Sequence, residues 1–202
     1  DVQYDKGGWR NRNRIKTPNG AAWLTVPVLI SGRFGQAINE VAIDSDKNWA
    51  RKHLRTIEQN YGAAACFNDY IPALRELLNR QWQFLAELDV TLIQEIASWL
   101  RIETAIHRVS SLSINGSSNE RLINLCRHFD ADRYLSGDAA KSYLDSAKFE
   151  SEKIAIEWQA YEHPRYTQMH GDFISHLSVI DLLLNCGEGS LSIMRNGRDR
   201  RL

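Results

Sequence analysis

Side chains that could exchange protons with a substrate are concentrated in residues 161–176, a polar segment without a clear helical or strand period. This pattern predicts a loop, and polar loops held by a rigid frame often carry binding or catalytic groups. The candidate side chains are His163, Tyr166, Gln168 and Asp172. The following residues, 177–184, turn apolar with helical spacing, so we expect the loop to be anchored in a core.

Two of these residues are candidate catalytic bases. His163 is one because imidazole titrates near neutral pH, and the alternative is a turn histidine preceding Pro164. Asp172 follows Gly171 in the predicted loop and could act as a base or bind a sugar hydroxyl. We expect Tyr166 and Gln168 to bind the substrate whose proton the base removes, the acceptor of the reaction.

No metal is expected at this segment. Six and five residues separate His163, His170 and His176, and these separations match no common zinc-binding pattern. The chain also contains no Walker loop, G-x-G-x-x-G, G-x-S-x-G or H-E-x-x-H motif. The sequence indicates no particular cofactor.

A second polar group lies near the start of the chain, where basic residues alternate with other types. Alternate residues of an extended backbone share a face, so one face would carry the basic residues and the other the asparagines. We expect the basic residues to bind phosphate and the asparagines to orient it. The alternative is a solvated edge strand protected by its charges. The predicted ligands are Arg10, Asn11, Arg12, Asn13, Arg14 and Lys16.

The surrounding pattern predicts the elements that position these groups. A turn at residues 16–20, containing Pro18 and Gly20, would join the basic strand to a β-rich run at 22–30. Helical spacing covers residues 47–60 and 70–102, and Asp89 is placed to begin a second helix within the latter range. We expect 70–102 to form a helical subregion.

From residue 104 onward, predicted strands alternate with predicted helices. The strands are expected at 104–114, 132–137 and 153–160, with helices after Ser117 and Asp138. This alternation predicts an α/β fold with a mostly parallel, Rossmann-like sheet flanked by helices, in one domain over residues 1–202. Ser136 and Gly137 would then end a strand and bind an anion at the following helix N-terminus.

Two pairs have the spacing of a helix capping box, Ser117 with Glu120 and Ser178 with Asp181. The second pair is therefore interpreted mainly as a cap of the helix that follows it. Whether Ser178 and Asp181 have a further role stays open at this point.

Composition limits the partners. The 25 basic and 25 acidic residues cancel, which disfavours nucleic-acid binding, and no apolar run is long enough to span a membrane. Cys66, Cys126 and Cys186 lack metal-binding spacing and are expected to be reduced thiols of a cytoplasmic protein. The expected partner is a small sugar or nucleotide-type ligand. The sequence does not indicate an oligomeric state.

Several separated motifs resemble the WbqC-like protein family across essentially the whole chain. They are KGGWRNRNRIKTPNG at 6–20, WLTVP at 23–27, YLSG at 134–137, YLD at 143–145, HPxYxQ at 163–168 and SxxDLL at 178–183. The resemblance implies a bacterial protein of surface-polysaccharide (O-antigen) biosynthesis that transfers an acyl or aminoacyl group to a sugar. Alternatives are a non-catalytic scaffold and, by analogy of fold, a nucleotide-dependent ligase or nucleotidyltransferase.

The family pattern also includes a His-Gln-Pro leader ahead of a strand end that resembles residues 1–3. This chain begins at Asp1. We therefore expect part of the site to precede the sequence in hand.

Overall fold

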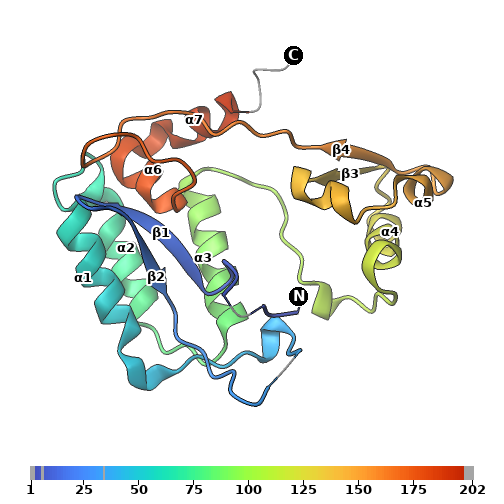
Figure 1. The fold of residues 1–202 in the computed structure, drawn as a ribbon, viewed down its shortest axis with the longest axis horizontal. Coiled ribbons are helices and arrows are strands. Elements are labelled where there is room, and N and C mark those ends of the chain that lie inside the picture. Colours follow the sequence, from blue (N-terminus) through green and yellow to red (C-terminus); the bar gives the residue numbers. More distant parts are fainter. Residues whose placement is uncertain (1–2, 6, 34, 198–202) are drawn as a thin grey trace. The chain divides into compact units, whose positions relative to one another are not determined.

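The computed structural model describes residues 3–5, 7–33 and 35–197 (Figure 1). Two units are distinguished, one comprising residues 1–106 and 163–195 and the other residues 107–162 and 196–202. Each has its own hydrophobic core. The single domain over residues 1–202 stays a prediction.

An antiparallel hairpin opens the first unit. Strand β1 (Arg12–Thr17) pairs with β2 (Gly20–Thr25), and Arg14 lies opposite Trp23. Gly20 has a φ of 103°, a conformation that glycine adopts without the steric cost of a side chain. The predicted hairpin and turn are confirmed.

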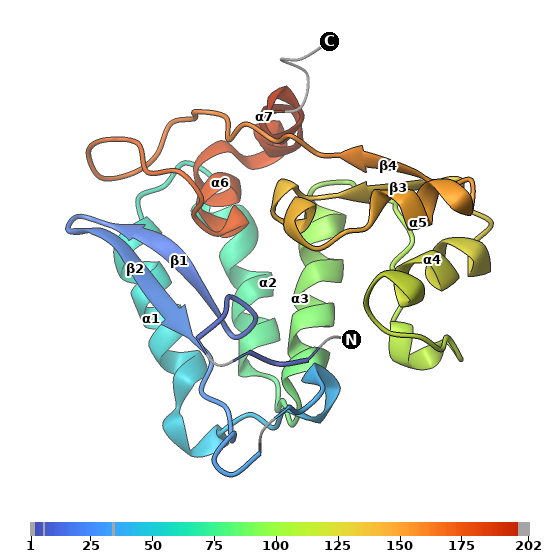
Figure 2. The ribbon, with the colours of Figure 1, turned by 45° about the vertical axis from the view of Figure 1, so that its right-hand side comes forward.

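Helices pack around this hairpin. The helices are α1 (Trp49–Tyr61), α2 (Phe67–Asn79), α3 (Leu85–Trp99), α6 (Val179–Cys186) and α7 (Ser190–Asn196). Both ribbon views show β1 beside α6, with α1 behind the hairpin (Figures 1 and 2). Ile15 from β1 and Leu184 from α6 are fully buried in the same core as Ile57 and Leu74. This packing holds the hairpin against the C-terminal segment.

The second unit contains a short parallel pair. Strand β3 (Arg133–Ser136) pairs in parallel with β4 (Ala155–Trp158), and α5 (Ser146–Ser151) lies between them in the chain. Helix α4 (Ser118–His128), labelled in Figure 2, contributes Ile123 to a core that also contains Phe149. The strand–helix–strand alternation is therefore confirmed for residues 133–158.

A mixed α/β fold is confirmed, but a Rossmann-like sheet is absent from the described residues. Their parallel pairing is limited to β3 and β4. Residues 104–114 form extended and turn structure with a short 3-10 helix, Val109–Ser111, and Ile106 is 44% exposed. Because these β-favouring residues have no strand to pair with and no core to enter, propensity alone does not make a strand there.

Strand β2 also ends earlier than predicted. Pro27 lacks a backbone N–H, and its carbonyl accepts a hydrogen bond from the Asp44 N–H instead of extending the hairpin. Val28 then forms an isolated bridge with Ile43.

Several predicted helix ends were wrong. Asp89 lies inside α3, because the break between α2 and α3 falls at residues 80–84. The predicted N-cap position of Ser117 is confirmed at the start of α4, although its side chain makes no capping hydrogen bond. The helix predicted after Asp138 is a 3-10 helix, Asp138–Ser142, followed by α5.

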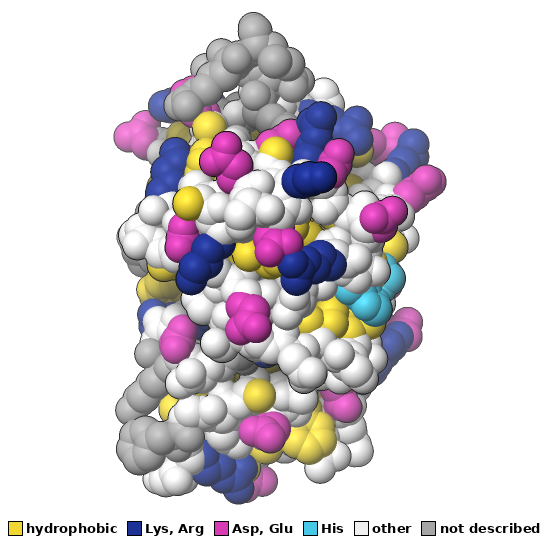
Figure 3. All heavy atoms as spheres, turned by 90° about the vertical axis from the view of Figure 1, so that its right-hand side faces the viewer, with side chains coloured by type: hydrophobic (Ala, Val, Ile, Leu, Met, Phe, Trp, Pro, Cys, Tyr) yellow, Lys and Arg dark blue, Asp and Glu magenta, His cyan; other side chains and the backbone are white. Residues whose placement is uncertain are grey.

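No helix among the described residues is both long and apolar enough to cross a membrane. Basic and acidic side chains are intermixed on the face shown in Figure 3. That mixture agrees with a net charge of zero.

Candidate functional site

The predicted loop is attached to the core through Asp181, on the first turn of α6. Its side chain is fully buried and accepts hydrogen bonds from Tyr61 Oη (2.7 Å), Tyr166 Oη (2.7 Å) and Gln168 Nε2 (3.0 Å). Within the described part of the chain, the carboxylate has no ion-pair partner. Three hydrogen-bond donors therefore compensate this buried charge.

Both tyrosines remain protonated donors. Burial raises the pKa of Tyr61, and the nearby Asp181 charge raises it further. Burial also raises the pKa of Tyr166, with a further contribution from its hydrogen bond to Asp181. The Tyr61 hydroxyl in turn accepts the backbone N–H of Lys16 at 2.7 Å. One phenol thus links α1, the hairpin and α6.

Further hydrogen bonds fix the loop between residues 168 and 174. Gln168 donates to the Ile174 carbonyl (2.9 Å) and accepts the Ile174 N–H (2.9 Å). Asn185 Oδ1 accepts the Met169 N–H at 3.2 Å. The Lys16 ammonium, on a side chain only 1% exposed, donates to the carbonyls of Gly171 (3.3 Å) and Asp172 (2.5 Å). The loop is therefore an ordered part of the first unit.

The hairpin contributes two arginines beside an exposed indole. The Arg12 and Arg14 Cζ atoms lie 4.3 and 5.8 Å from the Trp23 ring centroid, and Trp23 is 51% exposed. We call Arg12, Arg14 and Trp23 the hairpin face. Arg12 donates to the carbonyls of Gly7 and Gly8, which orient its guanidinium without neutralising its charge.

The hairpin face reaches the predicted base through one residue of the loop. Arg14 Nη2 donates to the His176 carbonyl at 3.0 Å, and the His176 ring centroid lies 4.9 Å from that of His163. Phe173 and Tyr166 also pack near His163, at centroid distances of 5.8 and 6.2 Å. The hairpin face and His163 are thus linked through His176.

The tautomer of His163 follows from its backbone contact. Its Nδ1 lies 2.9 Å from the Pro164 carbonyl, which can only accept, so Nδ1 carries the proton in this contact. Burial lowers the pKa of His163, and the neighbouring His176 lowers it further. A neutral imidazole with Nε2 as its proton acceptor is the resulting state.

The remaining predicted residues are placed differently. Arg10 pairs with Asp5 at 2.7 Å, and Asn11, which is 8% exposed, donates to the Val26 carbonyl. Asn13 is exposed and accepts the Arg14 N–H, while the Asp172 side chain is also exposed. Their ligand-binding and catalytic roles stay predictions.

Ser136 and Gly137 belong to the second unit, at the carboxyl end of β3. Their role in substrate binding is likewise a prediction. No group of three or more His, Cys, Asp or Glu side chains suited to a metal ion occurs in the described ranges.

Sequence reasoning missed the position of Asp181 and the contribution of Tyr61. Ser178 caps α6, its Oγ accepting the Ile180 N–H, but Asp181 makes its side-chain bonds elsewhere. The available signal was a carboxylate inside an apolar run, since a buried charge requires several polar partners. The identity of Tyr61, 120 residues away, required the fold.

Comparison with known proteins agrees with the sequence motifs. Residues 1–193 match the WbqC-like protein family. The chain is 40% identical over 197 residues to the uncharacterized protein Rv1507c of Mycobacterium tuberculosis, covering 96% of this chain and 85% of that protein. No solved structure matches. The chain belongs to the WbqC-like protein family.

Proposed function

We propose that this chain is a cytoplasmic transferase of bacterial surface-polysaccharide synthesis that moves an acyl or aminoacyl group from a phosphate-bearing donor to a sugar. Arg12 and Arg14 bind the donor phosphate, and His163 accepts the proton of the attacking hydroxyl. Membership of the WbqC-like family suggests the biological setting of this proposal. The arrangement of Arg12, Arg14 and Trp23 on the hairpin face is the structural observation that supports it.

The specific observation is that Arg12 and Arg14 both lie beside Trp23 and, in the part of the chain that the structure describes, have no carboxylate partner. Among the described residues neither forms an ion pair, whereas the adjacent Arg10 is paired with Asp5. Arg12 uses two donor atoms on backbone carbonyls and Arg14 uses one. Their other N–H groups can donate to phosphate oxygens, which guanidinium groups bind in bidentate geometry.

The proposed reaction is a nucleophilic substitution at the acyl carbonyl carbon of the donor. The acceptor oxygen forms a bond to that carbon while its proton moves to Nε2 of His163. The bond from carbon to the phosphate oxygen breaks, and the phosphate leaves with both bonding electrons. Arg12 and Arg14 stabilise the negative charge on this leaving group.

The donor is found by measuring thermal unfolding with nucleotide sugars, nucleotides and acyl phosphates. A ligand that binds only the folded chain raises the melting temperature. For a donor that supports transfer, His163→Gln is expected to lower kcat about 100-fold or more and to remove the ionisation of His163 from the pH–rate profile. An unchanged profile would exclude His163 as the base.

Thermal unfolding with these donors, together with the transfer assay, separates a transferase from a scaffold protein of the polysaccharide-assembly machinery. A scaffold would be stabilised by a partner protein and by none of the donors, and would produce no acylated sugar. That result would replace the proposed function.

A further inference from the structure

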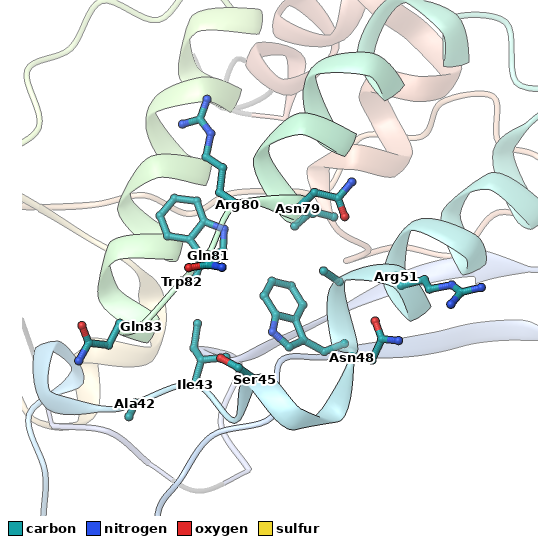
Figure 4. A pocket seen from close by; sticks show the side chains of 13 residues that line it. Ala42, Ile43, Ser45, Asn48, Arg51, Asn79, Arg80, Gln81, Trp82 and Gln83 are labelled. Carbon is teal, nitrogen blue, oxygen red and sulfur yellow. The ribbon is translucent and has the colours of Figure 1, made fainter.

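A hollow of about 700 Å³ lies in the first unit, between the start of α1 and the connection from α2 to α3. Its volume falls in the range of roughly 300–1,000 Å³ that is common for small-molecule sites. Trp49 and Trp82 both line it, and Figure 4 shows Trp82 among the neighbouring lining side chains. None of the residues lining it belongs to the hairpin face.

Trp49 offers this hollow a hydrogen-bond donor. Its side chain is 7% exposed, yet its indole N–H has no hydrogen-bond partner among the residues that the structure describes. Among the described residues, the fully buried side-chain polar atom without a hydrogen-bond partner is Gln36 Oε1. The Trp49 indole nitrogen also lacks a partner among them but is not fully buried, so its N–H is open to the hollow. A donor held this firmly favours a ligand with an acceptor oxygen.

Trp82 has a different role in the same hollow. Its N–H donates to the Leu77 carbonyl at 2.9 Å, which fixes the orientation of the ring. The half-buried ring surface then remains for contact with a ligand. An indole face is electron-rich, and it attracts the weakly positive C–H groups on the apolar face of a sugar ring.

Besides Arg51 and Arg80, the polar part of the lining consists of amide and hydroxyl groups and contains no carboxylate. These side chains are Ser45, Asn48, Asn79, Gln81 and Gln83. Amides both donate and accept, as do the hydroxyl groups of a sugar. Trp49, with nine-tenths of its surface covered, gives a nucleobase little ring face on which to stack.

We propose that this hollow is a saccharide-binding site, in which a sugar ring packs on Trp82 and one of its oxygens accepts the Trp49 N–H. The amides around the hollow bind the remaining hydroxyl groups. The proposal concerns a second site and does not depend on the transfer reaction at the hairpin face.

Indole N–H signals in two-dimensional NMR test the proposal directly, since the chain has six tryptophans. The probes are N-acetylglucosamine and glucose, with adenine as a flat aromatic comparison that contains no sugar. The signal that disappears in Trp49→Phe is expected to shift saturably with at least one sugar at millimolar concentration, and not with adenine.

Three variants complete the test. Trp49→Phe keeps an aromatic ring but removes the donor, and should weaken sugar binding about threefold to tenfold, as followed on the Trp82 signal. Gln81→Ala, at an exposed position, should weaken binding without affecting folding. Trp99→Phe is the control, because Trp99 lies outside the hollow and its N–H donates to Glu95.

Absence of a Trp49 shift with both sugars would overturn the proposal. So would an equal shift with adenine, or sugar affinity that is unchanged in both Trp49→Phe and Gln81→Ala.

Discussion

Replacing Asp181 is expected to destabilise the first unit more than replacing any exposed carboxylate. The fully buried carboxylate accepts hydrogen bonds from Tyr61, Tyr166 and Gln168, which connect α1 and the loop to α6. Asp181→Ala removes all three acceptor contacts and leaves the donors in a space closed to solvent. Asp181→Asn keeps the shape but replaces an acceptor oxygen with a second donor.

The expected magnitude follows from the number of bonds. A buried polar group left without its partner costs about 1–3 kcal/mol, so losing three acceptor contacts should cost about 3–9 kcal/mol in Asp181→Ala. In Asp181→Asn the remaining oxygen can take the place of Oδ2 and still accept from Tyr166 and Gln168, but the Tyr61 hydroxyl then faces an NH2 donor, and we expect a loss of about 1–3 kcal/mol. These values are large beside a typical unfolding free energy of about 5–15 kcal/mol.

Urea unfolding followed by circular dichroism measures this loss, and hydrogen exchange of residues 168–176 shows whether the loop is released. Asp172→Asn is the matched control, because it removes the same charge from an exposed position in that loop. An Asp181→Asn variant within about 0.5 kcal/mol of the parent, with unchanged loop exchange, would refute the role assigned to this carboxylate.

Three further predictions concern other buried groups. Burial raises the pKa of Asp89 to about 7, so its ionisation destabilises the fold as pH rises from about 4 to 7; relative to the parent, Asp89→Asn should gain about 4 kcal/mol at pH 8 and nothing at pH 3, in urea titrations at both values. Gly187→Ala should lose about 2–4 kcal/mol of unfolding free energy, because φ is 53° and the added Cβ would lie 2.6 Å from Cys66 Sγ. Gly171→Ala, with φ of 64° and open space, should lose only about 1 kcal/mol, and equal losses would refute the clash. Lys16→Met should speed hydrogen exchange across residues 168–176, because two loop carbonyls lose their ammonium donor, and unchanged exchange would contradict that role.

The elements best predicted from the sequence were those defined by local patterns. Helical spacing identified α1, α2, α3 and α6. The alternation of predicted strands with predicted helices after residue 104 included β3 and β4. Residues 104–114 have a similar preference for strand structure, but strand formation there needed a partner that the fold does not provide. Local propensity therefore located helices better than it located sheets.

The candidate site shows the same limit. Local spacing made Asp181 resemble a helix cap, whereas its partner Tyr61 comes from a helix 120 residues earlier. The basic residues at alternate positions from Arg10 to Lys16 were visible in the sequence. The burial of Lys16 and the pairing of Arg10 with Asp5, however, depend on tertiary contacts. Among the described residues Arg12 and Arg14 form no ion pair, and they support the proposal, whereas the ligand roles of Arg10, Asn11, Asn13 and Lys16 stay predictions.

The central claim is that Arg12 and Arg14 bind a phosphate group. Isothermal titration with UDP-glucose and with inorganic pyrophosphate measures it most directly, comparing the parent chain with the double variant Arg12→Gln, Arg14→Gln. The control is Arg55→Gln with Arg75→Gln, which removes two exposed positive charges from α1 and α2. We expect the hairpin variant to weaken binding of at least one probe about 100-fold, since each charge-assisted contact contributes about 1.5 kcal/mol or more, and the control to change it less than threefold. Binding that stays within twofold of the parent in the hairpin variant, or that falls equally in the control, would contradict the claim.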